Sequence, residues 1–290
     1  MTPLDPFRDG IWLKREDEHQ LGAFKWRGAA AVLEARRPDV VVTASTGNHG
    51  AATAWAARRA GVRAIVFVPE QASAAKLALI EAQGAELRRA GADMDEAKVA
   101  ARALADEEGW FLFEDGAEPA QFDGYAAIGE ELLDQLAEPP GSVVVPVGNG
   151  ALAIGIFRAL ARRAPSTERV AVSAAAAPVM WESWRAGRPM DCDRSATFAD
   201  GLAVRVAIPL AVAELNPLAQ RFEVVSEREL ALALGAYAEV GLRVEGAAAA
   251  PLAIASRERL RPPVVLIVTG RNVDEELWRR AVEAPDSFPP

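Results

Sequence analysis

The sequence predicts an α/β protein built from mostly parallel sheets flanked by helices. Short runs of β-branched, uncharged residues alternate with Ala-rich segments that are long enough to form helices. Such alternation implies right-handed crossovers between parallel strands. The 290 residues, 51% of them hydrophobic, are enough for two packed lobes or one large domain. A turn-rich stretch at 114–124 favours two lobes with a boundary there.

The first part of the chain follows this pattern closely. Strands are expected at 11–14, 40–44, 62–68, 85–89 and 110–113. Helices are expected at about 24–36, from the loop 45–50 to about 60, at 73–83 and at 94–107. Pro38 and Gly84 lie where two of these helices should end.

The alternation continues beyond the boundary. Strands are expected at 142–147, 169–173, 222–225 and 264–268. Helices are expected at about 125–137, from 148–152 to about 163, after a capping box at Ser226-Glu227-Arg228-Glu229, at 247–258 and near the chain end. The segment 186–201 is irregular and polar, and the tail 285–290 is expected to fray.

Composition excludes several classes of protein. The net charge of −9 argues against nucleic acid as a partner, because phosphate binding needs a basic surface. Cys192 is the single cysteine, which excludes an internal disulfide and favours the reducing cytoplasm. We expect no membrane span and no secretory signal, because no apolar run is long enough and the start is not basic.

Lys25 is the first candidate for chemistry. It lies between Phe24 and Trp26 at the start of an Ala-rich helix, with Arg27 close by. Apolar surroundings and a nearby cation both disfavour a second positive charge, so we expect part of this amine to be neutral. A neutral lysine can attack an aldehyde and form a Schiff base. A lysine at a helix start is more often a solvated surface charge, and the segment alone leaves both interpretations open.

Three loops follow predicted strands, at 45–50, 148–152 and 269–272. They end parallel strands, and ligands bind at that edge of such sheets. The glycines of 148–152 precede a helix N-terminus, which suits a phosphate group, although an ordinary turn would look the same. No Walker lysine and no dinucleotide fingerprint accompany this loop, so nucleotide binding is weakly supported.

The loop 45–50 also begins a helix. Ser45, Thr46, Asn48 and the backbone N–H groups suit a carboxylate, or they form a polar N-cap. His49 and the distant His19 do not make a metal site. Thr269, at the end of the last strand, either caps the sheet or offers its hydroxyl to a buried acceptor.

These motifs occur together in an order that is known from one family. The set comprises Thr2-Pro3-Leu4, Leu13-Lys14-Arg15-Glu16, the segment 22–29, the loop 45–50, the segment 146–152, Ala199-Asp200-Gly201, Val244-Glu245-Gly246 and the segment 269–274. The chain thus resembles the fold type II (tryptophan synthase β-like) pyridoxal phosphate enzymes. It is most similar to their serine/threonine dehydratase and serine racemase branch.

The resemblance implies a role for each motif. Lys25 would hold the cofactor aldehyde as a Schiff base and later act as the base at the substrate Cα. The other implied cofactor contacts are Phe24 beside the ring, Asn48 at the ring hydroxyl, Gly148, Asn149, Gly150, Ala151 and Leu152 around the 5′-phosphate, and Thr269 at the pyridine nitrogen. Ser45, Thr46, Gly47 and His49 would line the pocket for the substrate carboxylate, and Thr46 would be the second base in racemisation.

The resemblance also implies an organisation and an activity. A large lobe of 1–39 and 123–290 would bind the cofactor, with a small lobe of 40–122 inserted in it, and the protein would be a homodimer. The activity would be that of an ammonia-lyase that removes water from threonine or serine and gives a 2-oxo acid and ammonia. The alternatives are a threonine synthase-like β,γ-replacement, an amino acid racemase, and a non-catalytic binding protein with the same fold.

The chain departs from the branch at several positions. Ala23 replaces a usual Ser, and the phosphate loop reads Gly148-Asn149-Gly150-Ala151 in place of a run of glycines. That loop and Asp123-Gly124-Tyr125 look like threonine synthase. Ser173 and Val179 align with the acidic metal ligands of racemase-like members, so no metal site is expected. Arg271 stands where dehydratases often have Gly.

Overall fold

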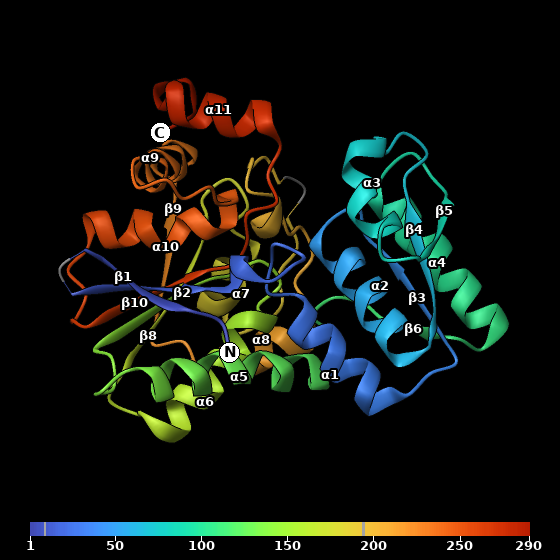
Figure 1. The fold of residues 1–290 in the computed structure, drawn as a ribbon, viewed down its shortest axis with the longest axis horizontal. Helices are drawn as coiled ribbons and strands as arrows, with labels where there is room; N and C mark the ends of the chain where they lie inside the picture. The colour runs from blue at the N-terminus through green and yellow to red at the C-terminus, as the bar shows by residue number, and fades with distance from the viewer. Residues whose placement is uncertain (9, 193–194) are drawn as a thin grey trace. The chain divides into compact units, whose positions relative to one another are not determined.

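The computed structural model describes residues 1–8, 10–192 and 195–290, in two compact units (Figure 1). Unit 1 comprises Met1–Phe24 and Tyr125–Pro290, and unit 2 comprises Lys25–Gly124. The units differ from the expected lobes in the segments 25–39 and 123–124, which fall in unit 2. The physical reason is that α1 (Trp26–Arg36) packs along α2 (Asn48–Ala60).

Unit 2 is a parallel sheet covered on both faces. Its strand order is β5-β4-β3-β6. The bounds are Val40–Ala44 for β3, Arg63–Val68 for β4, Glu86–Arg89 for β5 and Phe111–Leu112 for β6. Alternate side chains of β4 face α4 (Met94–Glu108) on one side, and α2 with α3 (Ala74–Glu81) on the other. A strand buried on both faces explains why its sequence is almost uniformly apolar.

Unit 1 contains a six-stranded sheet of order β1-β2-β10-β7-β8-β9. The bounds are Leu4–Arg8 for β1, Ile11–Arg15 for β2, Ser142–Pro146 for β7, Glu168–Ala174 for β8, Arg221–Val225 for β9 and Val264–Val268 for β10. Only β1 runs antiparallel to its neighbour among these pairs of described strands. The expectation of an α/β protein with mostly parallel sheets is confirmed.

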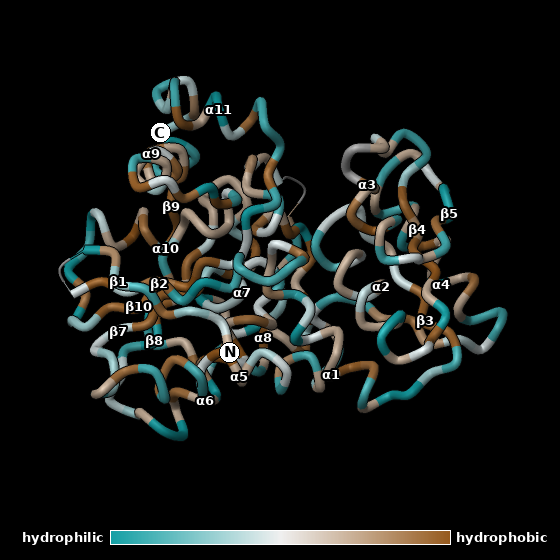
Figure 2. The backbone as a smooth tube through the Cα atoms, in the orientation of Figure 1, coloured by the Kyte–Doolittle hydropathy of each residue, from teal (hydrophilic) through white to brown (hydrophobic). Residues whose placement is uncertain are grey.

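Helices cover the sheet of unit 1 on both faces, as Figure 1 shows. Their bounds are Ala151–Arg163 for α6, Val179–Ala186 for α7, Pro209–Leu215 for α8, Glu227–Ala238 for α9, Gly246–Arg257 for α10 and Glu275–Glu283 for α11, while α5 (Pro119–Gln135) crosses the boundary between the units in sequence. Figure 2 shows hydrophobic colour along β10 and β3. None of the helices described has the length and hydropathy that crossing a membrane requires.

Most expected elements are present, and the capping box is confirmed. The Ser226 hydroxyl accepts from the Glu229 N–H at 3.2 Å, and the Glu229 carboxylate accepts from the Ser226 N–H at 2.7 Å. Residues 193–194 of the expected irregular segment 186–201 lie outside the described residues. Strand β1 was not expected, because Asp5 and Pro6 are poor strand formers that an antiparallel edge strand tolerates.

Two expectations about chain ends and turns were wrong. Helix α5 begins at Pro119 and not near 125, and it includes Gly124. A Cβ at Gly124 would lie 2.5 Å from the Arg27 carbonyl oxygen, so this glycine serves a close approach to α1 and not a turn. The tail is packed and not frayed, because Phe288 is buried with its ring centroid 4.8 Å from that of Phe198.

A buried charge ties the start of unit 1 to α5. Lys14 on β2 is fully buried, and its ammonium donates to the Glu131 carboxylate at 2.8 Å. It also donates to the Gln135 side-chain oxygen at 2.9 Å and to the Thr2 carbonyl oxygen at 2.8 Å. A buried charge is tolerated only when it is paired and hydrogen-bonded, and this ammonium is both.

The Lys14 pair allows a test with a neighbouring control. Glu131→Ala leaves the buried ammonium without its carboxylate, and we expect a loss of about 3 kcal/mol in the free energy of unfolding. Glu130→Ala, one residue away, removes pairs with the surface residues Arg162 and Arg163, and we expect a loss of about 1 kcal/mol at most. Urea unfolding followed by circular dichroism measures both variants, and equal losses would contradict the assignment.

Candidate active site

The site in unit 2 forms at the carboxyl edge of its sheet. Strands β3 and β6 are parallel neighbours, with Val41 opposite Phe111 and Val42 opposite Leu112. The Phe113 N–H donates to the Val42 carbonyl at 2.8 Å and extends this pairing. The loop 45–50 and the residues after β6 therefore leave the sheet at the same edge.

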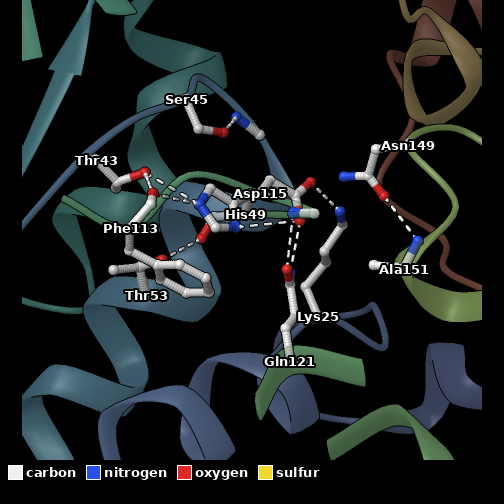
Figure 3. Close-up of polar contacts among 12 residues, drawn as sticks. Lys25, Thr43, Ser45, His49, Thr53, Phe113, Asp115, Gln121, Asn149 and Ala151 are labelled. Carbon is white, nitrogen blue, oxygen red and sulfur yellow. Dashed lines mark hydrogen bonds and ion pairs between the residues drawn. The ribbon is translucent and has the colours of Figure 1, made fainter. Parts of the chain in front are cut away.

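Lys25 faces a carboxylate at this edge. It is the N-cap residue of α1, and its ammonium forms a hydrogen-bonded ion pair with Asp115, as Figure 3 shows. The two side chains are 17% and 25% exposed, so the pair is largely shielded from solvent. Arg27 stacks on Trp26, with its guanidinium carbon 4.8 Å from the ring centroid. The sequence indicates only a cation near the amine, and Asp115 was not predicted.

Asp115 accepts a hydrogen bond from one further side chain and lies near a second. The Gln121 amide donates to its Oδ1 at 2.6 Å, while the Gln121 oxygen accepts from the Gly116 N–H at 2.7 Å. His49 Nδ1 lies 3.6 Å from the same Oδ1. Burial alone would raise the pKa of Asp115, but the charge of Lys25 and the hydrogen bonds from Lys25 and Gln121 outweigh burial and hold it well below its ordinary value. The group is a carboxylate at neutral pH.

His49 points inward and not toward solvent. It is buried, with Nε2 at 3.0 Å from the Thr43 hydroxyl and 3.3 Å from the Phe113 carbonyl oxygen. Thr43 donates its own proton to that carbonyl at 2.8 Å, so its oxygen accepts from Nε2–H. Burial, with some help from the Lys25 charge, lowers the pKa of His49 against the opposing effect of Asp115. The neutral ring with its proton on Nε2 fits this network.

The loop 45–50 has an open side above the start of α2. The Ser45 hydroxyl accepts from the Gly47 N–H at 3.1 Å, and Gly47 is the N-cap residue of α2. A Cβ at Gly47 would meet no atom within 4 Å, whereas one at Gly50 would lie 2.9 Å from the Ser45 carbonyl oxygen. Thr46 and Asn48 are half-buried in the same loop. The positive end of a helix beside open space suits a carboxylate.

The loop 148–152 in unit 1 is built around two constrained glycines. A Cβ at Gly148 would lie 2.2 Å from the Gly201 carbonyl oxygen, so no larger residue fits. Gly150 has φ +98° and is the N-cap residue of α6. The Asn149 side-chain oxygen accepts from the Ala151 N–H at 3.1 Å (Figure 3). Leu152 follows in the first turn of α6, where backbone N–H groups point toward the loop.

Thr269 lies at the same edge of the unit 1 sheet, because β10 and β7 are parallel neighbours. Its hydroxyl donates to the Glu245 carboxylate at 2.9 Å, so it meets a buried acceptor. The Phe24 N–H donates to the Thr269 carbonyl oxygen at 3.0 Å, and the Phe24 ring lies 5.0 Å from that of Tyr125. Phe24 and Thr269 are therefore neighbours.

Metal ligands do not gather in the part of the chain that the structure describes. Among these residues, no group of three or more His, Cys, Asp or Glu side chains could hold a metal ion. Ser173 donates to the Val147 carbonyl oxygen at 2.5 Å and joins β8 to the end of β7. Val179 is a buried apolar residue at the start of α7.

These sites define the chain's class when they are combined with comparisons to known proteins. The sequence model of the family described as pyridoxal-phosphate dependent enzyme matches residues 2–270. The chain belongs to this family, and pyridoxal phosphate is its cofactor. The fold type II resemblance is confirmed.

Several relatives make the comparison more specific. An L-threonine ammonia-lyase of Geobacter sulfurreducens is 33% identical over 281 residues, which are 94% of this chain and 70% of that protein. A biosynthetic L-threonine dehydratase of Pasteurella multocida is 33% identical over 199 residues, 67% of this chain but 39% of that protein. The chain thus spans well under half of that relative.

Solved structures agree on the fold. The processed form of threonine deaminase isoform 2 from Solanum lycopersicum has a TM-score of 0.92 at 26% identity, covering 97% of this chain and 87% of that one. The T.th. threonine deaminase has a TM-score of 0.88 at 30% identity, covering 94% and 93%. Maize serine racemase has a TM-score of 0.88 at 25% identity, covering 99% and 93%.

The residues present fit the family's cofactor. Gly148 leaves a cradle that a Cβ would fill, at the start of a 13-residue helix whose N-terminus attracts an anion. Lys25 carries a half-buried amine that could meet an aldehyde. Thr269 presents a buried hydroxyl at the end of β10. Each of these groups has the chemistry that one part of pyridoxal phosphate needs.

The close approach at Gly148 predicts that an added methyl group lowers stability there, and a helical glycine elsewhere serves as a control that should gain stability. Gly148→Ala forces the backbone of the loop or of Gly201 to shift, and we expect a loss of about 1–3 kcal/mol in stability. Gly235→Ala, in the interior of α9 where a Cβ would meet nothing within 4 Å, should gain about 0.5–1 kcal/mol. Thermal unfolding of both variants distinguishes these signs.

The lowered pKa of His49 predicts a pH dependence of stability. The unfolded chain binds a proton at the ordinary histidine pKa of about 6.5, while the folded protein binds it only at lower pH. His49 therefore destabilises the fold increasingly as pH falls below about 6.5. We expect the wild type to unfold at a higher urea concentration than His49→Gln at pH 7.5. This difference in unfolding midpoint should become smaller when the pH is lowered to 5.5. A constant or growing advantage would contradict the assignment.

Proposed function

We propose that the chain is an ammonia-lyase that removes water from small β-hydroxy amino acids such as L-threonine or L-serine and yields a 2-oxo acid and ammonia. The observation that carries the proposal is the shielded Lys25 amine at the carboxyl edge of the unit 2 sheet. The relative named L-threonine ammonia-lyase, matched over 94% of this chain, supports the choice of substrate.

The proposal gives each cofactor contact to residues of this chain. When bound, pyridoxal phosphate supplies an aldehyde and an electron-withdrawing ring that makes the substrate Cα proton acidic. Lys25 would hold the aldehyde through its amine. The remaining contacts would be Phe24 against the ring, Asn48 at the ring hydroxyl, Gly148, Asn149, Gly150, Ala151 and Leu152 at the phosphate, and Thr269 at the ring nitrogen. A hydroxyl at that nitrogen does not hold the ring protonated as a carboxylate would, which favours prompt loss of a β-substituent.

The substrate carboxylate would bind at the loop 45–50. Ser45, Thr46 and Gly47 lie at the N-terminus of α2, where N–H groups and the helix dipole favour an anion. His49 would contribute its backbone, because its side chain faces Thr43 and Phe113. This arrangement would hold the amino acid with its Cα accessible to Lys25.

Lys25 would then act as the base. Its amine would take the proton from the substrate Cα and pass it to the β-hydroxyl, which would leave as water. The enamine that is set free takes up one water molecule in solution and gives the 2-oxo acid and ammonia. The proposal includes a homodimer in the cytoplasm, which rests on the family resemblance and on Cys192 being the single cysteine of the chain.

Two observations support other activities of the same class. Thr46 has a hydroxyl in the loop 45–50 and would be the second base of an amino acid racemase, as maize serine racemase is a structural neighbour. Asn149 and Ala151 give the phosphate loop a threonine synthase-like sequence, which supports a β,γ-replacement. A non-catalytic binding protein would take up the cofactor without turnover. Separate assays with L-threonine, L-serine, D-serine and O-phosphohomoserine discriminate these activities.

The proposed role of Lys25 is tested by comparing two lysines. Lys25→Ala should lose the visible absorbance of bound cofactor, and 2-oxo acid formation from L-threonine should fall about a thousandfold or more. Lys98→Ala, an exposed lysine on α4, should change neither property. Cofactor absorbance that persists in the purified Lys25→Ala protein would overturn the proposed role.

A further inference from the structure

The Asp115 carboxylate divides its two oxygens between different partners. Oδ2 accepts from the Lys25 ammonium, while Oδ1 accepts from Gln121 at 2.6 Å. His49 Nδ1, the ring nitrogen without a proton in the neutral tautomer, lies 3.6 Å from Oδ1. The Gln121 contact fixes the carboxylate so that Oδ2 stays directed at Lys25.

The position of Lys25 makes this carboxylate important. Lys25 occupies the N-cap position of α1, and His49 in the first turn of α2 lies 3.6 Å from Asp115. Helix N-termini carry partial positive charge and disfavour an ammonium. The neighbouring acid Glu114 pairs with Arg102 at 2.9 Å. Asp115 therefore supplies a negative charge beside the Lys25 ammonium, with which it forms an ion pair.

We propose that Asp115 is a positioning residue of the enzyme, which orients Lys25 and stabilises the ammonium that forms when Lys25 takes the substrate proton. This inference rests on the proposed function. In the step, the C–H bond at the substrate Cα breaks and an N–H bond forms at Lys25, while the electron pair stays with the substrate carbon. The new positive charge then faces the Asp115 carboxylate, which compensates it as it forms.

The proposal predicts two effects of opposite direction in Asp115→Asn. Without the carboxylate the Lys25 amine is no longer held in an ion pair, so the protein should capture added pyridoxal phosphate about tenfold faster. The same change removes the carboxylate that faces the ammonium formed in the step, so kcat for L-threonine should fall about tenfold or more. A residue that merely supports the local structure would slow both processes when it is replaced.

The experiment follows capture of the cofactor by the full chain. The cofactor is removed by dialysis against an amine that competes for it, pyridoxal phosphate is added back, and the rise of visible absorbance is timed from pH 6 to pH 9. We expect the pH at half-maximal rate to move lower in Asp115→Asn. An unchanged or higher value, or slower capture at pH 7, would overturn the proposal.

Matched variants separate charge from structure. Glu114→Gln removes a negative charge from the adjacent position of the same segment and should leave the pH dependence of capture unchanged. Asp115→Glu keeps the charge and should restore most of the wild-type pH dependence. If Asp115→Asn does not fold, Asp115→Ser makes the same test with a smaller neutral side chain. A shift of equal size in Glu114→Gln would overturn the specific role of Asp115.

The outcomes distinguish this inference from the proposed function. If the wild type captures no cofactor, both fail. If the wild type captures cofactor and converts L-threonine but Asp115→Asn shows an unchanged pH dependence, only the role of Asp115 fails. Faster capture with a lower kcat supports both.

Discussion

The ion pair between Lys25 and Asp115 is the interaction on which the unit 2 site depends. An ammonium at the N-cap of α1 is disfavoured by about 0.3–1 kcal/mol through the helix dipole. The same dipole favours a carboxylate, and so does the N-terminus of α2 close to His49. Each charge of the pair therefore makes the other tolerable in a place where neither is fully exposed.

Sheet topology brings these two residues to one edge. Lys25 and Asp115 are 90 residues apart in sequence. Strand β6 consists of two residues, yet it pairs beside β3 and not beside β5, which precedes it in the chain. The loop 45–50 and Asp115 meet because parallel neighbours end on the same side. In unit 1 the pairing of β7 with β10 joins the loop 148–152 to Thr269 in the same way.

The sequence predicted those parts of the fold and site that local patterns encode. Uncharged β-branched runs located β3 and β10 to the residue, and the Ser226 capping box was read from four residues. The family and its cofactor followed from ordered motifs, while the role of Lys25 as the reactive lysine stays a prediction. Asp115 was not predicted, because it lies in a turn-rich segment whose neighbours depend on the pairing of β6 with β3. The inward direction of His49 likewise depends on Thr43 and the Phe113 carbonyl.

In unit 1, glycine-containing motifs that are distant in sequence pack against one another. Gly148 leaves room for the carbonyl of Gly201, and a Cβ at Gly201 would lie 2.9 Å from that of Ala247. A Cβ at Gly246 would lie 2.9 Å from Ala199, and one at Gly270 would lie 2.7 Å from the Glu245 carboxylate. Close backbone approaches thus connect four motifs in space, at 148–152, 199–201, 244–246 and 269–274.

The same geometry accounts for the sequence of the loop 148–152. Gly148 and Gly150 are required, one by the 2.2 Å approach of Gly201 and the other by φ +98°. Asn149 lies between these two glycines and Ala151 follows Gly150. Neither position needs a positive φ or the absence of a Cβ. The Asn149 oxygen satisfies the Ala151 N–H at 3.1 Å, as a capping side chain does at a helix start. A phosphate at this loop would have to share that N–H with Asn149 or displace the Asn149 side chain. Asn149 and Ala151 would therefore change how strongly the loop binds an anion, while the backbone path set by Gly148 and Gly150 stays the same.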